Sequence, residues 1–145
     1  MAFVVDLLPK EYGYVILVFV LYGFFNVWMA AQVGKARKKY KMFYPVLYAL
    51  ESENKDANLF NCVQRGHQHS LEMMPVFFAL LLLGGLQYLV VAAGLGFVYI
   101  VGRYFYFNGY GSGDPKKRMR GGFYALSLLG LVGCTISLGV NLLRQ

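Results

Sequence analysis

Four long apolar stretches, separated by polar or basic segments, follow one another along the chain. The first and the last are nearly uniform, at residues 12–33 and 121–143. Between them lie two less uniform stretches, at about 59–88 and 89–110, joined without any charged residue. A helix needs about 20 mainly apolar residues to cross a bilayer. The pattern therefore predicts an all-α integral membrane protein whose four transmembrane helices form one bundle and one domain, residues 1–145.

The composition agrees with a membrane protein. Of 145 residues, 58% are hydrophobic and only 14% are charged, against roughly 25% charged residues in ordinary soluble domains. The net charge of +7 could indicate a nucleic-acid partner, but such binding requires a basic surface on a soluble fold. Here the positive charges lie between apolar stretches, so we expect no nucleic-acid partner.

Most Lys and Arg residues are confined to two connecting segments. Six of the 14 lie in residues 34–59 and four lie in residues 111–120, whereas the connection between the two central stretches has none. Because cytoplasmic loops of membrane proteins carry an excess of Lys and Arg, both basic segments are predicted to be cytoplasmic. Both chain termini would then lie on the opposite side of the membrane.

Residues 60–75, FNCVQRGHQHSLEMMP, place many polar side chains at the start of the second apolar stretch. Four of them recur at intervals of 4, 4 and 3 residues and share one face of the predicted helix: Asn61, Arg65, His69 and Glu72. Gln68 lies beside this face, and His67 points elsewhere. Ionisable residues inside a membrane are costly and usually mark a function.

The third apolar stretch carries a matching polar face. Its members, spaced 4, 3 and 4 residues apart, are Tyr99, Arg103, Tyr106 and Tyr110. Together the two faces suit a small zwitterionic ligand with carboxylates, because Arg binds carboxylates in a bidentate way and Tyr hydroxyls donate hydrogen bonds. Glu72 could accept an ammonium group. The alternative is that Arg65 and Glu72 only pair with each other or with Arg103 and hold the bundle together.

Two sharper kinds of site do not fit the spacing. His67 and His69 are two residues apart and lie on different faces of a helix, which disfavours a zinc pair. The segment GYGSGDPKKR at residues 109–118 is rich in glycine, but it lacks the ending of a phosphate-binding loop and follows a membrane helix instead of a strand.

Four blocks of sequence, in order, carry a family resemblance: KARKKYK, FNCVQRGHQHSLEMMP, VGRYFYFNGY and KKRMRGG. With these blocks the chain resembles, over nearly its whole length, the MAPEG family of membrane glutathione enzymes. The resemblance implies a homotrimer of four-helix subunits in the endoplasmic reticulum membrane. Glutathione would bind at each subunit interface towards the cytosol, as a co-substrate and without a metal. The second substrate, a hydrophobic electrophile or lipid hydroperoxide, would enter from the membrane lipid.

The resemblance also implies roles for individual residues. The residues expected to bind glutathione are Arg37, Lys38, Arg65, His67, His69, Glu72, Arg103, Tyr106 and Tyr110. Arg37 and Lys38 correspond to a basic pair that reaches the ligand of the neighbouring subunit. Two positions depart from the family pattern, since His69 replaces an Asn and Met73 replaces a Tyr that follows the Glu.

The catalytic assignment falls on the last basic block. Relatives use an Arg at the start of the fourth helix to hold the glutathione sulfur as a thiolate. The alignment gives this role to Arg118, with Arg120 as the rival because the loop leaves room for a shift of one or two residues. A free thiol has a pKa of about 8.5 and reacts as the thiolate. A nearby guanidinium favours the anion and lowers that pKa.

Three alternative functions are considered for the sequence. The first is a glutathione transferase and glutathione-dependent peroxidase, with conjugation of the leukotriene C synthase type as one possible reaction. The second is a non-catalytic member of the same fold that binds lipid and presents fatty acids to partner enzymes. The third is a proton-coupled transporter using Glu72 and His69. A transporter predicts polar residues through the whole membrane depth, whereas those found here crowd towards one end of the helices.

Overall fold

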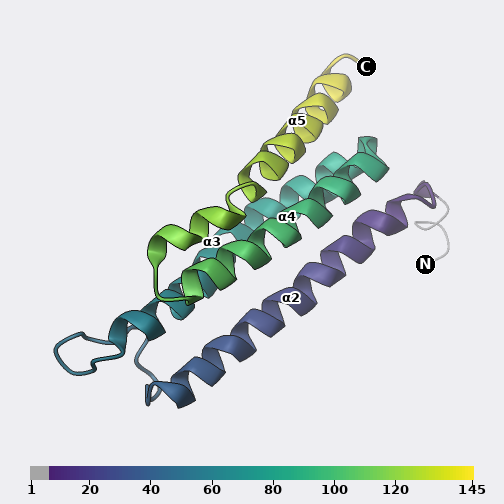
Figure 1. Cartoon of the computed structure of the whole chain (residues 1–145). Helices are drawn as coiled ribbons and strands as arrows, with labels where there is room; N and C mark the ends of the chain where they lie inside the picture. Colours follow the sequence, from purple (N-terminus) through teal and green to yellow (C-terminus); the bar gives the residue numbers. More distant parts are fainter. Residues whose placement is uncertain (1–6) are drawn as a thin grey trace.

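The computed structural model describes residues 7–145, which form a bundle of long helices (Figure 1). Four of its helices are long and apolar enough to cross a membrane, which confirms the predicted all-α membrane fold. A 3₁₀ helix, η1, precedes the last of them. In chain order the elements are α2 (Tyr12–Lys39), α3 (Ala57–Gln87), α4 (Leu89–Gly111), η1 (Pro115–Gly121) and α5 (Tyr124–Leu143).

The helices alternate in direction along the bundle. The start of α2, the junction of α3 with α4 and the end of α5 all lie at one end, at the upper right of Figure 1. Only Tyr88 separates α3 from α4, where the sequence pattern predicts a tight turn. The two longer connections, residues 40–56 and 112–123, therefore share the opposite end of the bundle, where most of the basic residues of the chain lie.

Helix α2 continues beyond its apolar stretch to Lys39. Arg37 and Lys38, which the sequence pattern places in a connecting segment, are therefore helical. Lys and Arg have good helix propensity, and positive charge in the last turn is favourable next to the unpaired carbonyls there. The apolar pattern marks where the membrane ends, and the helix itself ends one to two turns later.

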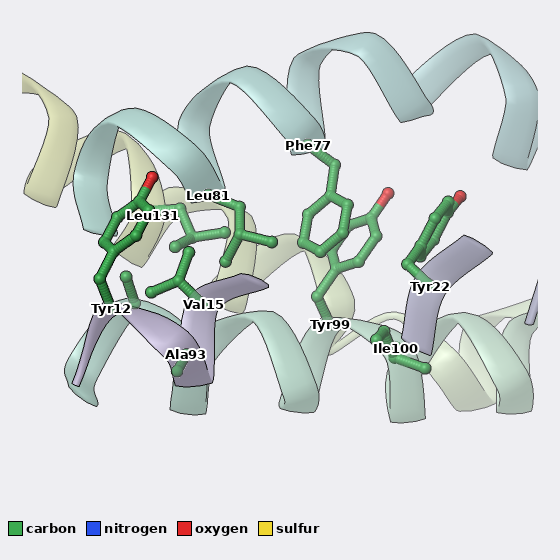
Figure 2. Packing of buried hydrophobic residues seen from close by; sticks show 10 residues of the cluster. Tyr12, Val15, Tyr22, Phe77, Leu81, Ala93, Tyr99, Ile100 and Leu131 are labelled. Atoms are coloured by element: carbon green, nitrogen blue, oxygen red, sulfur yellow. The ribbon is translucent and has the colours of Figure 1, made fainter. Parts of the chain in front are cut away.

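The apolar core lies between α2, α3, α4 and α5 (Figure 2). Phe77 of α3 stacks on Tyr99 of α4 with 4.0 Å between ring centroids. Small residues also bring the helices close together in this core. A Cβ on Gly96 would lie 2.8 Å from the Leu81 side chain, and one on Gly85 would lie 2.9 Å from Val15. Such contacts are closer than real Cβ atoms allow, so a larger residue at either position would force the neighbouring side chain to shift.

Helix η1 lies directly against α4, and glycines make this approach possible. A Cβ on Gly109 would collide with the Lys117 carbonyl, and one on Gly121 would collide with the backbone of Tyr106. The start of η1 is fixed by Asp114, whose carboxylate accepts a hydrogen bond from the Lys116 N–H at 3.0 Å. The basic block that carries Arg118 is thus held by backbone contacts on the polar half of α4.

Candidate functional site

The polar face of α3 is open at the surface of the chain. The Arg65 guanidinium donates to the Glu72 carboxylate at 2.7 Å, and the two side chains are 39% and 46% exposed. Asn61 does not join them, because its amide bonds both backbone groups of Ala49 in the preceding connection. The pairing of Arg65 with Glu72 is the structural role considered as an alternative above, and it leaves both side chains accessible.

Arg103 of α4 lies behind this face and is 0% exposed. Its guanidinium packs over the rings of Tyr106 and Tyr124, with 4.2 and 4.7 Å to the ring centroids. One terminal nitrogen contacts His69 Nδ1 at 2.9 Å and the other donates to the Ser70 hydroxyl. Arg103 therefore contacts neutral side chains and none of the exposed carboxylates.

The contact with Arg103 fixes the tautomer of His69. A guanidinium has only donors, so Nδ1 of His69 must accept the hydrogen bond and the ring proton lies on Nε2. The ring also stacks on Tyr106, with 5.1 Å between centroids. His69 is thus held from two sides, and its Nε2–H remains as the hydrogen-bond donor.

A pocket of about 420 Å³ brings together residues of α3, α4, η1 and α5. This volume falls in the usual range for small-molecule sites. The lining residues are Arg65, His69, Tyr106, Tyr110, Arg118, Met119, Gly122, Tyr124 and Ala125. We call this cavity the arginine pocket. Its described lining has two guanidiniums, one imidazole and three phenols but no carboxylate, so its charge suits an anionic ligand.

Helix η1 places Arg118 and Arg120 differently. Arg118 is half-buried, lies over the ring of Tyr110 at 5.5 Å, and donates to the Pro115 carbonyl at 3.2 Å. Arg120 is exposed and is not part of the lining of the arginine pocket. Of the two candidate catalytic residues, Arg118 alone faces the pocket within one chain.

Other residues assigned to glutathione lie away from the arginine pocket. His67 Nε2 lies 3.1 Å from the Asn26 side chain and so connects α3 to α2. Arg37 is buried, donates to the Val46 carbonyl at 2.8 Å, and shares with Lys38 the lining of a separate cavity of about 580 Å³. A single chain therefore does not bring Arg37, Lys38 and His67 together with Arg65.

Two residues of this region were not among the sequence candidates. Ser70 is fully buried and accepts from Arg103, while its carbonyl accepts from the Tyr22 hydroxyl at 3.2 Å. Tyr124, the first residue of α5, lines the pocket and covers Arg103. Ser70 follows His69 directly in the polar stretch, which was a usable signal. Tyr124 has none, because only the fold of η1 brings it to α4.

Comparison with known proteins places this architecture in a family. The model of the MAPEG family matches residues 15–140. The chain belongs to the MAPEG family. Human microsomal glutathione S-transferase 2 is 38% identical over 114 residues, covering 78% of this chain and 72% of the relative. The bovine protein of the same name is 36% identical, with 78% and 73% covered.

These relatives correct one prediction within the MAPEG family. The sequence blocks alone favour microsomal glutathione S-transferase 3 as the most similar member. The relatives that match, including the mouse protein at 36% identity, are all named microsomal glutathione S-transferase 2. Single blocks of sequence emphasise a few site residues, whereas these alignments extend over more than 110 residues, so the finer prediction is wrong.

Proposed function

We propose that the protein is a membrane glutathione transferase with glutathione-dependent peroxidase activity on lipophilic electrophiles and lipid hydroperoxides. The observation that carries this proposal is the arginine pocket, in which Arg65 and Arg118 face one cavity together with Tyr106 and Tyr110. Membership of the MAPEG family and similarity to microsomal glutathione S-transferase 2 supply the ligand and the reaction class.

In this proposal Arg118 holds the glutathione sulfur as the thiolate. The guanidinium of Arg118 stays positively charged at all working pH values. A positive charge nearby favours the thiolate over the thiol. Arg65 and Glu72 exchange part of their mutual contact for the carboxylates and the ammonium of the ligand. Glutathione itself supplies the nucleophilic atom. The sulfur then attacks an electrophilic carbon of a substrate that arrives from the membrane, and the new C–S bond replaces the C–O bond of an epoxide or the bond to a leaving group. With a lipid hydroperoxide, the sulfur attacks the terminal oxygen, the O–O bond breaks and the lipid alcohol leaves. A second glutathione then reacts with the resulting sulfenic acid to give glutathione disulfide and water.

Two exposed charged side chains of α3 support the expected homotrimer. Arg65 and Glu72 are exposed on a membrane helix of a single chain, and charges facing lipid are costly. A neighbouring subunit would cover them. It would also bring its own Arg37 and Lys38 towards the ligand. We propose that the complete glutathione site lies between subunits, in the endoplasmic reticulum membrane, with the basic segments on the cytosolic side.

Thiolate formation tests this function directly. Purified detergent-solubilised protein is titrated with glutathione and the thiolate is followed by ultraviolet difference absorbance at neutral pH. We expect a signal in the wild type and in Arg120→Ala, and a loss of at least tenfold in Arg118→Ala. Loss only in Arg120→Ala would keep the enzyme and move the catalytic residue. A folded wild type that binds fatty acid but gives no thiolate signal would favour the non-catalytic lipid-binding function.

A further inference from the structure

A second polar cavity lies at the basic end of the bundle, between α2 and α4 and apart from the arginine pocket. Its volume is about 330 Å³. Its lining combines polar residues with an apolar floor: Gln32, Lys35, Ala36, Lys39, Tyr40, Val63, Phe107, Asn108, Gly111 and Ser112. It shares no residue with the arginine pocket. We call it the lysine cavity.

Positive charge and hydrogen-bond donors meet in the lysine cavity from two helices. Lys35 and Lys39 are one turn apart on α2, and Asn108 lines the same cavity from α4. The Asn108 amide nitrogen donates to the Tyr104 carbonyl at 3.1 Å and has a second hydrogen to donate. Ammonium groups and amide N–H donors of this kind bind anionic oxygen atoms.

No carboxylate within residues 7–145 neutralises the two lysines. The ion pair of this part of the chain joins Arg65 to Glu72, on a different face of the bundle. The described lining of the lysine cavity contains neither Asp nor Glu. The charge of Lys35 and Lys39 is therefore available to an anion from outside the chain.

Aromatic residues place the lysine cavity at the level of lipid headgroups. Trp28 and Tyr104 lie one turn deeper along α2 and α4 than Gln32 and Asn108, and their ring centroids are 5.6 Å apart. Trp and Tyr concentrate where the hydrocarbon core meets the headgroups. Tyr104 is 45% exposed and Asn108 is exposed as well, so this side of the cavity is accessible from outside the chain.

We propose that the lysine cavity binds the headgroup phosphate of an anionic phospholipid, with the acyl chains passing over Trp28 and Tyr104. Basic pockets between membrane helices on the cytoplasmic side bind anionic headgroups. A membrane lipid fits better than a soluble phosphate because the floor formed by Val63 and Phe107 is apolar and the aromatic pair continues it into the membrane. This lipid site is separate from the proposed glutathione chemistry and stands without it.

Native mass spectrometry of the full chain tests the site. Detergent-purified protein is mixed with equimolar phosphatidylserine and phosphatidylcholine of identical acyl chains, and the retained lipid is counted. We expect the serine lipid to be retained at least fivefold more than the choline lipid. Lys35→Gln/Lys39→Gln should bring the two lipids to parity. The control Lys55→Gln/Lys116→Gln, which removes the same charge from exposed positions at the same end, should keep the preference.

Two further arms make the outcomes decisive. Asn108→Asp adds a negative charge inside the cavity while both lysines remain, so the preference should fall without loss of fold as judged by size-exclusion elution. Millimolar inorganic phosphate should leave the serine lipid bound. Equal retention of both lipids by the wild type, an unchanged preference in the double lysine variant, or displacement by inorganic phosphate would each overturn the proposal.

Discussion

Tyr99 and Arg103 lie one turn apart on α4, and both side chains are 0% exposed, yet they belong to different regions of the molecule. Tyr99 stacks on Phe77 inside the apolar core, and its hydroxyl has no hydrogen-bond partner among residues 7–145. Arg103 is also enclosed by aromatic rings, but its two terminal nitrogens reach His69 and Ser70, while its Nε has no partner among these residues. Aromatic rings pack against both Tyr99 and Arg103. Only the packed Arg103 also fixes the orientation of a residue of the arginine pocket, His69.

The difference predicts a division of labour between the two regions. Changes in the apolar region, around Phe77 and Tyr99, should reduce stability and leave the chemistry of folded molecules intact. Changes in the polar region, around Arg103 and η1, should affect ligand binding more than stability. The exception should be the backbone contact between η1 and α4, because it both stabilises the fold and positions Arg118 for ligand binding.

The largest effect on thiolate formation is expected from Gly121→Ala. A Cβ there would collide with the backbone of Tyr106 and the Gly102 carbonyl, and backbone cannot give way as a flexible side chain can. Overpacking of this kind costs about 1–3 kcal/mol. Displacement of η1 would also move Arg118 away from Tyr110. We expect loss of most thiolate absorbance together with a lower unfolding midpoint in denaturant.

The matched control for this variant is Gly133→Ala on α5, where nothing lies within 4 Å of the added Cβ. It should retain the wild-type thiolate signal and unfolding midpoint. Retention of both properties in Gly121→Ala as well would mean that η1 can shift without moving Arg118, and the proposed coupling between the two regions would be lost.

Phe77→Ala tests the apolar region alone. Removing a fully buried Phe typically costs about 3–5 kcal/mol, and here it also removes the stacking partner of Tyr99. We expect a large drop in the unfolding free energy, measured by denaturant titration in detergent. The thiolate signal per folded molecule should stay within about twofold of the wild type. A loss of signal in molecules that remain folded would show that the apolar region also shapes the pocket.

The periodicity of the sequence predicts the helices and much of the grouping of polar residues. It does not predict the features that depend on how the helices pack against one another. The four apolar stretches predict the helices, and residue spacing groups His69, Tyr106 and Tyr110, which all line the arginine pocket. The spacing of residues shows which of them share a helix face, but it does not show which of them are buried by another helix. Arg103 has the same period as its tyrosine neighbours, yet Tyr124 from α5 covers it. Only the tertiary packing of α5 makes Arg103 a buried residue that contacts His69.

The register of η1 was likewise beyond the reach of spacing. Arg118 and Arg120 are equally basic and two residues apart, and a flexible loop could have offered either one. The contacts of Gly109 and Gly121 with the backbone of neighbouring segments decide the orientation. The glycines are visible in the sequence, but what they approach is visible only in the fold.

A moderate effect is expected when the link between Arg103 and His69 is removed. Arg103→Met keeps much of the side-chain volume but frees the His69 ring, so its Nε2–H no longer points reliably into the pocket. We expect the KM for glutathione to rise about tenfold, equivalent to about 1.4 kcal/mol, with a smaller change in kcat. Arg103→Lys, which can still donate to Nδ1, should recover part of the loss.

Nitrogen-15 NMR of labelled histidine gives a readout that a purely structural role would not change. In the wild type, the shifts of His69 should report a proton on Nε2, and in Arg103→Met they should report a mixture of tautomers. His69→Asn, which restores the residue typical of the family, should keep a low KM in either background. A single tautomer in both proteins would show that Arg103 does not orient His69.

The smallest effect is expected in the pH dependence of Arg118→Lys. In the wild type, the rate should rise with pH through the pKa of bound glutathione, which a guanidinium lowers from the free value of about 8.5. A Lys keeps the positive charge but lacks the planar fork. The pKa of the bound thiol should therefore move up by less than about one unit, with less thiolate at neutral pH and an unchanged plateau at high pH. Stopped-flow rates from pH 6 to 9 measure the midpoint, and a shift in the opposite direction would place the sulfur away from Arg118.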